Sequence, residues 1–317
     1  MSNEDLWHAF PRTLPEFEKR FSSEDACRDY LIQVRWGGTP RCGSCSSEEL
    51  WLLKKGLWEC RRCGFQTSLL TNTPFERSRK PLRLWFRAIW EVVTRKSGVS
   101  GKDLQRILGF GSYETAWTWL HKIRRAMVRP GRDRLSGTVE IDETFIGAPE
   151  EDVHGRETED KAIVVVAAEQ RGRASRIRLQ RIADASAESL RAFVAESVTP
   201  GALVITDGWL GYSGLESLGY QHRIKNIKRS GMPAHKLLPR VHRIASLLKR
   251  WLMGTLQGGV QQRHLDYYLD EFTFRFNRRT SRSRGLLFYR LMQQAATMMP
   301  TPYQDIVRRA KSFDHNI

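Results

Sequence analysis

The chain has 317 residues, of which 40% are apolar and 10% aromatic. This composition is typical of a globular protein and argues against disorder, and the length predicts two or three domains. Lys and Arg number 52 against 35 Asp and Glu, and the formal charge of +17 indicates a polyanionic partner, above all nucleic acid. The alternatives are a basic surface that only maintains solubility and one that meets an anionic membrane.

The sequence carries no signal for membrane insertion or secretion. No stretch reaches the ~18 apolar residues of a spanning helix, and MSNED at the start of the chain lacks the basic and apolar regions of a signal peptide. We therefore expect a cytoplasmic, DNA-associated protein.

The first 80 residues are predicted to hold a helical lead-in and a zinc ribbon. Loosely periodic apolar residues favour short helices over 1–35. The stretch from Pro40 to Thr73 is rich in Cys, Gly and Ser, which favours hairpins too small to fold without a metal. We place the zinc ribbon over 36–75.

Cysteine spacing supports that metal. Four of the five Cys form two CxxC motifs, separated by fourteen residues: Cys42, Cys45, Cys60 and Cys63. Each motif places two thiolates on one tight turn, and two turns complete a tetrahedral zinc site. A redox pair is the alternative, but two pairs with Gly43 and Gly64 at turn positions favour zinc in a reducing compartment. Because protein would fill all four positions, the zinc is expected to be structural; Cys27 is expected to be a small buried apolar residue.

A helix-turn-helix DNA-binding domain is predicted over 80–130. Ser100 can cap a helix over 102–108 and Ser112 one over 113–128, with a Gly-Phe-Gly turn between them. In the second helix cations interleave with apolar residues, so one face can pack while the other meets a DNA groove. Any helical hairpin gives a similar pattern, and the zinc ribbon and the positive charge favour the DNA-binding interpretation. The predicted DNA-binding residues are Lys122, Arg124, Arg125 and Arg129.

After residue 136 the apolar period changes from helical to strand-like. Three strands followed by alternating helices and strands indicate a ribonuclease-H-like α/β core over 136–260, with a C-terminal helical region over 261–317. The second strand has the continuous apolar run of a strand covered on both faces. The acidic stretch Glu150–Asp160 is predicted to be a loop without an assigned function. We expect strands over 139–146, 161–169, 177–182, 203–206 and 222–225, and helices over 187–197, 212–218, 241–253 and 264–276.

Two carboxylates mark a candidate catalytic site. Asp142 lies in the first strand of the core, and Asp207 ends the apolar strand 203–206 before Gly208. A carboxylate at the exit of a buried strand is costly without a purpose, although for Asp207 a turn or helix-cap role is a serious alternative. Two such groups on adjacent strands could bind hard divalent cations for phosphodiester chemistry.

His242 and Lys249 extend this site. They are seven residues apart in a predicted helix, so they point the same way, about 10.5 Å apart along the axis. One side chain could then reach the metals and the other a phosphate. For an isolated His and Lys, a solvated polar face would be the better interpretation.

Four stretches of the sequence carry a specific resemblance: VEIDETFIG at 139–147, TDGWLGY at 206–212, SLLKRWLMGT at 246–255 and YLDEFTFRFNRR at 268–279. From about Tyr30 to Leu291 the chain resembles insertion-sequence transposases with an N-terminal zinc ribbon and an ISXO-like DDE catalytic domain. The resemblance implies a multidomain α/β protein.

The resemblance also implies roles for the site residues. Asp142 and Asp207 correspond to the first two catalytic residues and metal ligands, and Lys249, which would also contact DNA, to the family's lysine seven positions after the third. The third position falls on His242, where many relatives carry Glu or Asn. Metal ligation through nitrogen and the positioning of water both remain open for this residue, as does the choice between Mg²⁺ and Mn²⁺.

The function expected from these observations is DNA transposition. The protein would bind double-stranded DNA at terminal inverted repeats, cut at the element's ends and join them to target DNA, as a dimer or higher oligomer. One alternative is a DNA-binding regulator with an inactive ribonuclease-H-like fold. Another is a different nuclease of that fold, such as a junction resolvase or an RNA–DNA hybrid nuclease; strand transfer separates the three.

Overall fold

The computed structural model describes residues 10–129, 131–147, 161–172, 175–256, 260–281 and 283–308. The acidic stretch Glu150–Asp160 lies outside them. The described residues form two compact units, one made of those up to Arg129 and from Ser281 to Arg308, the other of those between 131 and Thr280. Within the described ranges, no helix is both long and apolar enough to cross a membrane.

The first unit combines helices with a small antiparallel sheet of order β1-β2-β3. Its strands are β1 (Leu50–Leu52), β2 (Trp58–Cys60) and β3 (Gln66–Thr67). Its helices are α2 (Leu14–Arg20), α3 (Glu24–Trp36), α4 (Leu82–Thr94), α5 (Gly101–Leu108), α6 (Tyr113–Arg125), α12 (Arg284–Thr297) and α13 (Tyr303–Arg308).

Aromatic packing explains why α12 belongs to this unit. Phe288 of α12 is buried, and its ring centroid lies 5.4 Å from that of Phe17 and 5.7 Å from that of Phe86. Trp85 of α4 stacks on Trp119 of α6 at 3.6 Å. Such rings bury large apolar areas, which stabilises a unit of short helices.

The second unit is built on a five-stranded sheet of order β6-β5-β4-β7-β8. β4 and β6 each pair antiparallel with β5, whereas β4, β7 and β8 run parallel. The strands are β4 (Thr138–Ile146), β5 (Ala162–Glu169), β6 (Ile177–Ile182), β7 (Leu203–Thr206) and β8 (Gln221–Ile224). The helices are α7 (Ala187–Ser197), α8 (Ile227–Ser230), α9 (Ala234–Leu237), α10 (Pro239–Leu256) and α11 (Leu265–Asn277), with 3-10 turns η2 (Leu210–Tyr212), η3 (Glu216–Leu218) and η4 (Gln262–His264).

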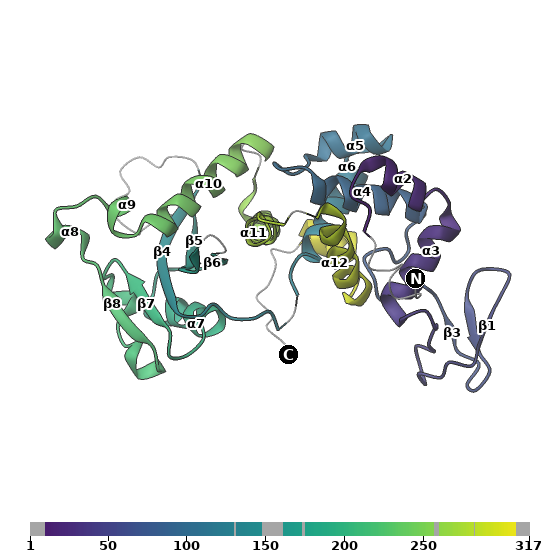
Figure 1. The fold of residues 1–317 in the computed structure, drawn as a ribbon, viewed down its shortest axis with the longest axis horizontal. Coiled ribbons are helices and arrows are strands. Elements are labelled where there is room, and N and C mark those ends of the chain that lie inside the picture. The colour runs from purple at the N-terminus through teal and green to yellow at the C-terminus, as the bar shows by residue number, and fades with distance from the viewer. Residues whose placement is uncertain are drawn as a thin grey trace. The chain divides into compact units, whose positions relative to one another are not determined.

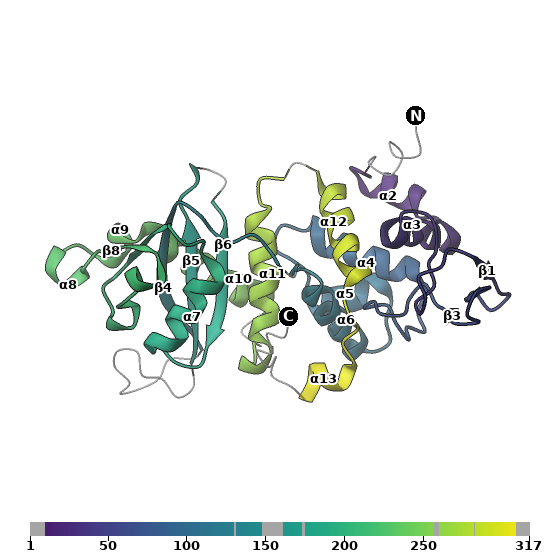
Figure 2. The same cartoon turned by 90° about the horizontal axis from the view of Figure 1, so that it is seen from below.

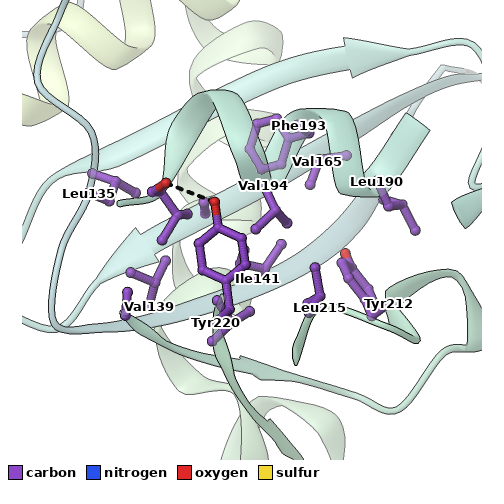
Figure 3. Packing of buried hydrophobic residues seen from close by; sticks show 14 of the residues in the cluster. Leu135, Val139, Ile141, Val165, Leu190, Phe193, Val194, Tyr212, Leu215 and Tyr220 are labelled. Carbon is purple, nitrogen blue, oxygen red and sulfur yellow. Dashed lines mark hydrogen bonds between the residues drawn. The ribbon is translucent and has the colours of Figure 1, made fainter. Parts of the chain in front are cut away.

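Helices cover both faces of this sheet (Figures 1 and 2). On one face, α7 buries Leu190, Phe193 and Val194 against alternate residues of β4 and β5, and the Tyr220 hydroxyl donates to the Val198 carbonyl at 3.1 Å (Figure 3). On the other face, α10 and α11 bury their apolar residues against the remaining alternate positions. Every residue of β5 is buried, as expected for a strand covered on both sides.

The structure confirms the predicted fold class: a zinc-ribbon-like cysteine region followed by an α/β core with C-terminal helices. The core elements begin and end at most three residues from the predicted ranges, except that 212–218 forms two 3-10 turns instead of one helix. The C-terminal helices divide between the units, because α11 contacts β6 while α12 contacts α3 and α4.

Candidate catalytic site and metal centres

The four paired cysteines gather at one point of the first unit. Their sulfur atoms lie within 4.8 Å of one another, with Cys42 Sγ 3.5 Å from Cys63 Sγ and Cys45 Sγ 3.6 Å from Cys60 Sγ. A tetrahedral zinc with bonds of about 2.3 Å separates its sulfur ligands by about 3.8 Å. The cluster therefore fits a structural zinc with four thiolate ligands.

The two turns that carry these thiols have the same backbone geometry. The N–H of Ser46 donates to the Cys42 carbonyl at 3.0 Å, and that of Gly64 to the Cys60 carbonyl at 2.9 Å. Both donors have left-handed backbones, with φ of 58° and 71°. The Cys45 N–H donates to Cys42 Sγ and lowers the pKa of that thiol to about 6, which favours the thiolate form that binds metal.

Sheet pairing brings the two candidate carboxylates together. β4 and β7 are parallel, with Val139 beside Val204 and Glu140 beside Ile205. Continued by two residues, this register sets Asp207 beside Asp142 at the carboxyl end of β7. The Asp142 side chain is 14% exposed.

Backbone N–H groups orient both carboxylates. Asp142 Oδ1 accepts from the Glu143 N–H at 2.9 Å, and Asp207 Oδ1 accepts from the Trp209 N–H at 2.9 Å. The bond at Asp207 is the local turn that the sequence offers as an alternative to catalysis. This hydrogen bond uses Asp207 Oδ1, so the turn is compatible with a catalytic role for Asp207 Oδ2.

His242 lies on α10, the helix that packs against β4, and faces Asp142. Its Nε2 lies 3.4 Å from Asp142 Oδ2, is buried, and makes no hydrogen bond in the described structure. Burial, with a smaller contribution from His235, lowers the pKa of His242. The ring is thus held neutral, which is the form that can donate a lone pair to a metal.

A second carboxylate on β4 fixes the helix that carries His242. Glu140 is 4% exposed, and its Oε2 accepts from the N–H groups of Arg240 at 2.8 Å and Val241 at 3.4 Å. These are orphan donors of the first turn of α10, where a negative charge is favoured. Because side chains alternate along β4, Glu140 and Asp142 face α10 together.

The loop after Asp207 packs tightly against its surroundings. Gly208 has φ of +90°, and a Cβ there would lie 2.6 Å from Ile224 Cγ2. The Trp209 indole donates to the Ala185 carbonyl at 2.9 Å. A Cβ on Gly211 would lie 2.6 Å from Leu190 and 2.9 Å from the same carbonyl, so both glycines are required by close approach.

Tyr212 ties this loop to β4. It is buried, and its hydroxyl donates a hydrogen bond to Glu143 Oε1. Burial and the neighbouring Glu143 raise the pKa of Tyr212 well above its ordinary value, so the phenol stays a donor. Glu143 therefore anchors the Asp207 loop, and Glu140 anchors the His242 helix.

Lys249 lies on α10 with an exposed side chain. The helix runs unbroken from Pro239 to Leu256, so Lys249 projects from the same side as His242, about 10.5 Å further along the axis. The helical spacing that the sequence predicts is present. Among the described residues, the cysteines form the compact group of metal-ligand atoms, and Asp142, Asp207 and His242 are less closely gathered.

The structure changes one of the predicted DNA contacts. Arg125 and Arg129 are exposed and Lys122 is half-buried, whereas Arg124 is only 2% exposed. The Arg124 side chain packs inside the first unit, so this structure does not support it as a DNA contact. Ser112 precedes α6 as predicted but makes no capping bond, while Ser100 caps α5.

Sequence reasoning missed three residues of this site. Glu140, Glu143 and Tyr212 lie inside the motifs VEIDETFIG and TDGWLGY and received no role. The signal that could have revealed Glu140 is its position in a buried strand, because a buried carboxylate needs a hydrogen-bonding partner. Its partner is 100 residues away in the chain, which the sequence alone does not reveal.

Comparison with known proteins identifies the family. Residues 134–277 match the family described as the ISXO2-like transposase domain, and residues 22–66 match the transposase zinc-ribbon domain. A protein in transposable element ISH50 of Halobacterium salinarum, described as uncharacterized, is 30% identical over 283 residues, or 81% of this chain and 92% of that protein. The chain therefore belongs to the insertion-sequence transposases with a zinc ribbon and an ISXO2-like domain, which confirms the resemblance.

Solved structures add little. One chain of a cryo-EM structure of a simian T-cell lymphotropic virus intasome, in complex with PP2A regulatory subunit B56 gamma, is 15% identical with a TM-score of 0.30. The match covers 56% of this chain and 64% of that one. A likeness this distant carries no argument.

Proposed function

We propose that the protein is an active DNA transposase that binds the terminal inverted repeats of its element, cuts the ends and transfers them to target DNA. The observation that supports this proposal best is the convergence of three groups from separate elements. The register of β4 and β7, continued by two residues, sets Asp142 beside Asp207, and His242 Nε2 on α10 is 3.4 Å from Asp142 Oδ2.

These three side chains suit a divalent metal site. Mg²⁺ prefers oxygen ligands and so favours the two carboxylates, whereas Mn²⁺ also accepts the nitrogen of a neutral imidazole. Bound divalent cations would activate the attacking oxygen and stabilise the leaving oxygen in phosphodiester chemistry. Asp142, Asp207 and His242 would hold them, while Lys249 would neutralise a phosphate further along the strand.

The proposed reaction has two displacements at phosphorus. In the first, a water oxygen bonds to the phosphorus at the element's end while the bond to the 3′ oxygen breaks, which frees a 3′ hydroxyl. In the second, that hydroxyl oxygen bonds to a target phosphorus, and the target's own 3′ oxygen leaves. No covalent enzyme intermediate is needed, so the residues only position and polarise the reacting groups.

The proposal is tested by cleavage of a duplex carrying the element's ends. Wild-type protein should nick it only with Mg²⁺ or Mn²⁺, and Asp207→Asn should bind equally well and lose nicking by at least about a hundredfold. Asp184→Asn is the matched control, because Asp184 is an exposed residue of the same unit that accepts bonds from Ser186 and Ser189. Binding without any nicking by wild type would instead indicate a regulator with an inactive fold.

A further inference from the structure

A long segment next to the candidate site contains no acidic residue. Between Glu216 and Asp266 the sequence has ten Lys and Arg and no Asp or Glu. At the chain's average frequency, a segment of this length would hold about five acids. The segment holds β8, α8, α9, all of α10 and η4, and β8 pairs with β7.

The structure separates the cations that serve the fold from those that face solvent. Lys225 Nζ donates to the Leu237 carbonyl at 2.8 Å, and Arg240 lies 3.7 Å from Glu140. From β8 to the end of α10, six others are exposed, and no ion pair to them is found in the described ranges: Arg223, Arg229, Lys236, Arg243, Lys249 and Arg250. We call these six the acid-free face.

This face begins directly beside the candidate site. Ile224 of β8 pairs with Thr206, the residue before Asp207, and Arg223 pairs with Ile205, so Arg223 lies on the strand next to the one that Asp207 ends. α9 contacts the first turn of α10, and Figure 1 shows it between α8 and that turn.

The solvent side of α10 continues the face. Val241, Ile244, Leu248 and Leu252 are buried on the sheet. Arg243 and Arg250 are left on the outward side of the helix, and Lys249 at its flank, on the side of His242. Burial and, to a smaller extent, Arg243 lower the pKa of Arg279, which lies in the turn after α11. Like charges gathered without counter-charges are unfavourable until an anion neutralises them.

We infer that the acid-free face is a second DNA-binding surface, which holds the phosphate backbone of a duplex on both sides of the bond to be cut, without reading its sequence. Duplex DNA fits because it presents a dense row of phosphates, and Lys and Arg bind these by releasing counterions. The inference rests on the proposed function, since it names the surface that would hold flanking and target DNA. It is separate from the predicted contacts of α6, which belong to the other unit.

The test measures binding to a duplex that lacks the element's ends. All proteins carry Asp207→Asn, so that the DNA is not consumed. The test variant adds Arg223→Ala and Lys236→Ala, two exposed cations outside the candidate catalytic site. The matched control adds Arg134→Ala and Arg171→Ala, two exposed cations of the same unit that lie outside the acid-free face. Circular dichroism verifies that both variants fold.

The readout is the slope of log affinity against log salt concentration. Each cation that meets a phosphate contributes about 0.9 to this slope, so the test variant should lose about 1.8 and the control none. The affinity should fall by the same factor on a terminal-repeat duplex, because phosphate contacts do not depend on sequence. An unchanged slope in the test variant, or an equal loss in the control, would overturn the inference; a loss confined to terminal-repeat DNA would show that the face reads sequence.

These results are independent of catalysis. If wild-type protein never cuts the element's ends while the acid-free face still binds duplex DNA, the proposed function fails and the surface stands. If wild-type protein cleaves normally and the salt slope of the test variant does not change, the inferred DNA-binding surface is wrong and the proposed function stands.

Discussion

Alternation along β4 gives neighbouring carboxylates different surroundings. Glu140 and Asp142 face α10, where one accepts from the helix N-terminus and the other lies opposite His242. Glu143 points the other way and accepts from Tyr212. A run of three acids within four residues thus joins three segments of the chain, and the consequences of changing each acid should differ.

Glu140 is predicted to act by positioning His242. Glu140→Ala removes a charge-assisted bond worth ~1.5–3 kcal/mol to the first turn of α10, and should lower cleavage by roughly tenfold or more. Glu140→Gln keeps an acceptor and should restore most of the loss. The decisive measurement is the Mn²⁺ concentration for half-maximal cleavage, which should rise in the Ala variant. If the Ala variant cleaves less DNA but reaches half-maximal cleavage at the same Mn²⁺ concentration, Glu140 only stabilises the fold.

His242 is predicted to set the metal preference. A site with one nitrogen ligand should work with Mn²⁺ at least as well as with Mg²⁺, and His242→Glu should shift the preference towards Mg²⁺. His242→Ala should slow cleavage by at least about tenfold with either ion. His235→Ala is the control, since His235 is exposed and nearby. Cleavage rates are compared on uncut and pre-cut terminal-repeat duplexes.

Two outcomes would count against His242. If His242→Glu leaves the ratio of Mn²⁺ to Mg²⁺ rates unchanged, the ring positions water or packs against the sheet and does not bind metal. If His242→Ala cleaves at the wild-type rate, the residue is outside the active site altogether.

At the scale of single residues, the sequence predicts the candidate catalytic residues better than the residues that hold them in position. Asp207 follows from a strand end, His242 and Lys249 from helical spacing, and the roles of all four residues, Asp142 included, from the family resemblance. Glu140 and Tyr212 require tertiary contacts spanning 100 and 69 residues, which no local pattern encodes. Arg124 failed for a related reason: the helical pattern gives the cationic residues, but not which of them the neighbouring helices cover.

Among the elements, the zinc ribbon should depend on its metal. Three strands of two or three residues cannot bury enough apolar surface to be stable alone. Purified protein should hold about one zinc per chain, and Cys60→Ser should lose it while the sheet of the other unit stays folded. Cys27→Ala is the control, because Cys27 is buried away from the cluster. Protein purified without chelator and found free of zinc would contradict the assignment.

Glu169 should make the second unit sensitive to acid. It is 1% exposed, and accepts from Arg176 at 2.8 and 2.9 Å and from the Ser136 N–H at 3.0 Å. Burial opposes the charge, but Arg176 and Ser136 outweigh it and lower the pKa of Glu169 to about 2. A lowered pKa in the folded state means stability that is present above the ordinary value of 4.5 and is lost as the pH falls towards 2.

Unfolding by denaturant tests this link. Glu169→Gln should cost roughly 1–3 kcal/mol at neutral pH. The difference between wild type and variant should shrink as the pH is lowered from 5 towards 3. A difference that stays constant over that range would show that the carboxylate charge contributes nothing.

Element positions were largely predictable because the core alternates strand and helix with clear periods. The strand 177–182 and the helix 187–197 agree with the structure at both ends. Capping was less predictable. The first turn of α4 is capped by Glu24 of α3, whose carboxylate accepts from Leu82 and Arg83 at 2.7 and 3.2 Å, and no signal near Pro81 indicates this.

For the whole molecule, charge and unit composition support one account. The first unit carries the cysteine cluster and the exposed Arg125 and Arg129, and the second carries Asp142, Asp207 and the acid-free face. A protein that only recognises DNA does not need the carboxylates of the second unit. A simple nuclease does not need the cysteine cluster and the exposed cations of the first unit. Joining ends to a target requires both.

Strand transfer tests that account most directly. A pre-cut terminal-repeat duplex with a 3′ hydroxyl is incubated with wild-type protein, target plasmid and Mn²⁺, and joined product is measured. The same duplex with a 3′-deoxy end lacks the attacking oxygen, so it should give no product, and Asp142→Asn should give none with either end. Joining that requires the 3′ hydroxyl, the metal and Asp142 is the predicted result. Binding of the ends with no joined product under any of these conditions would contradict the account.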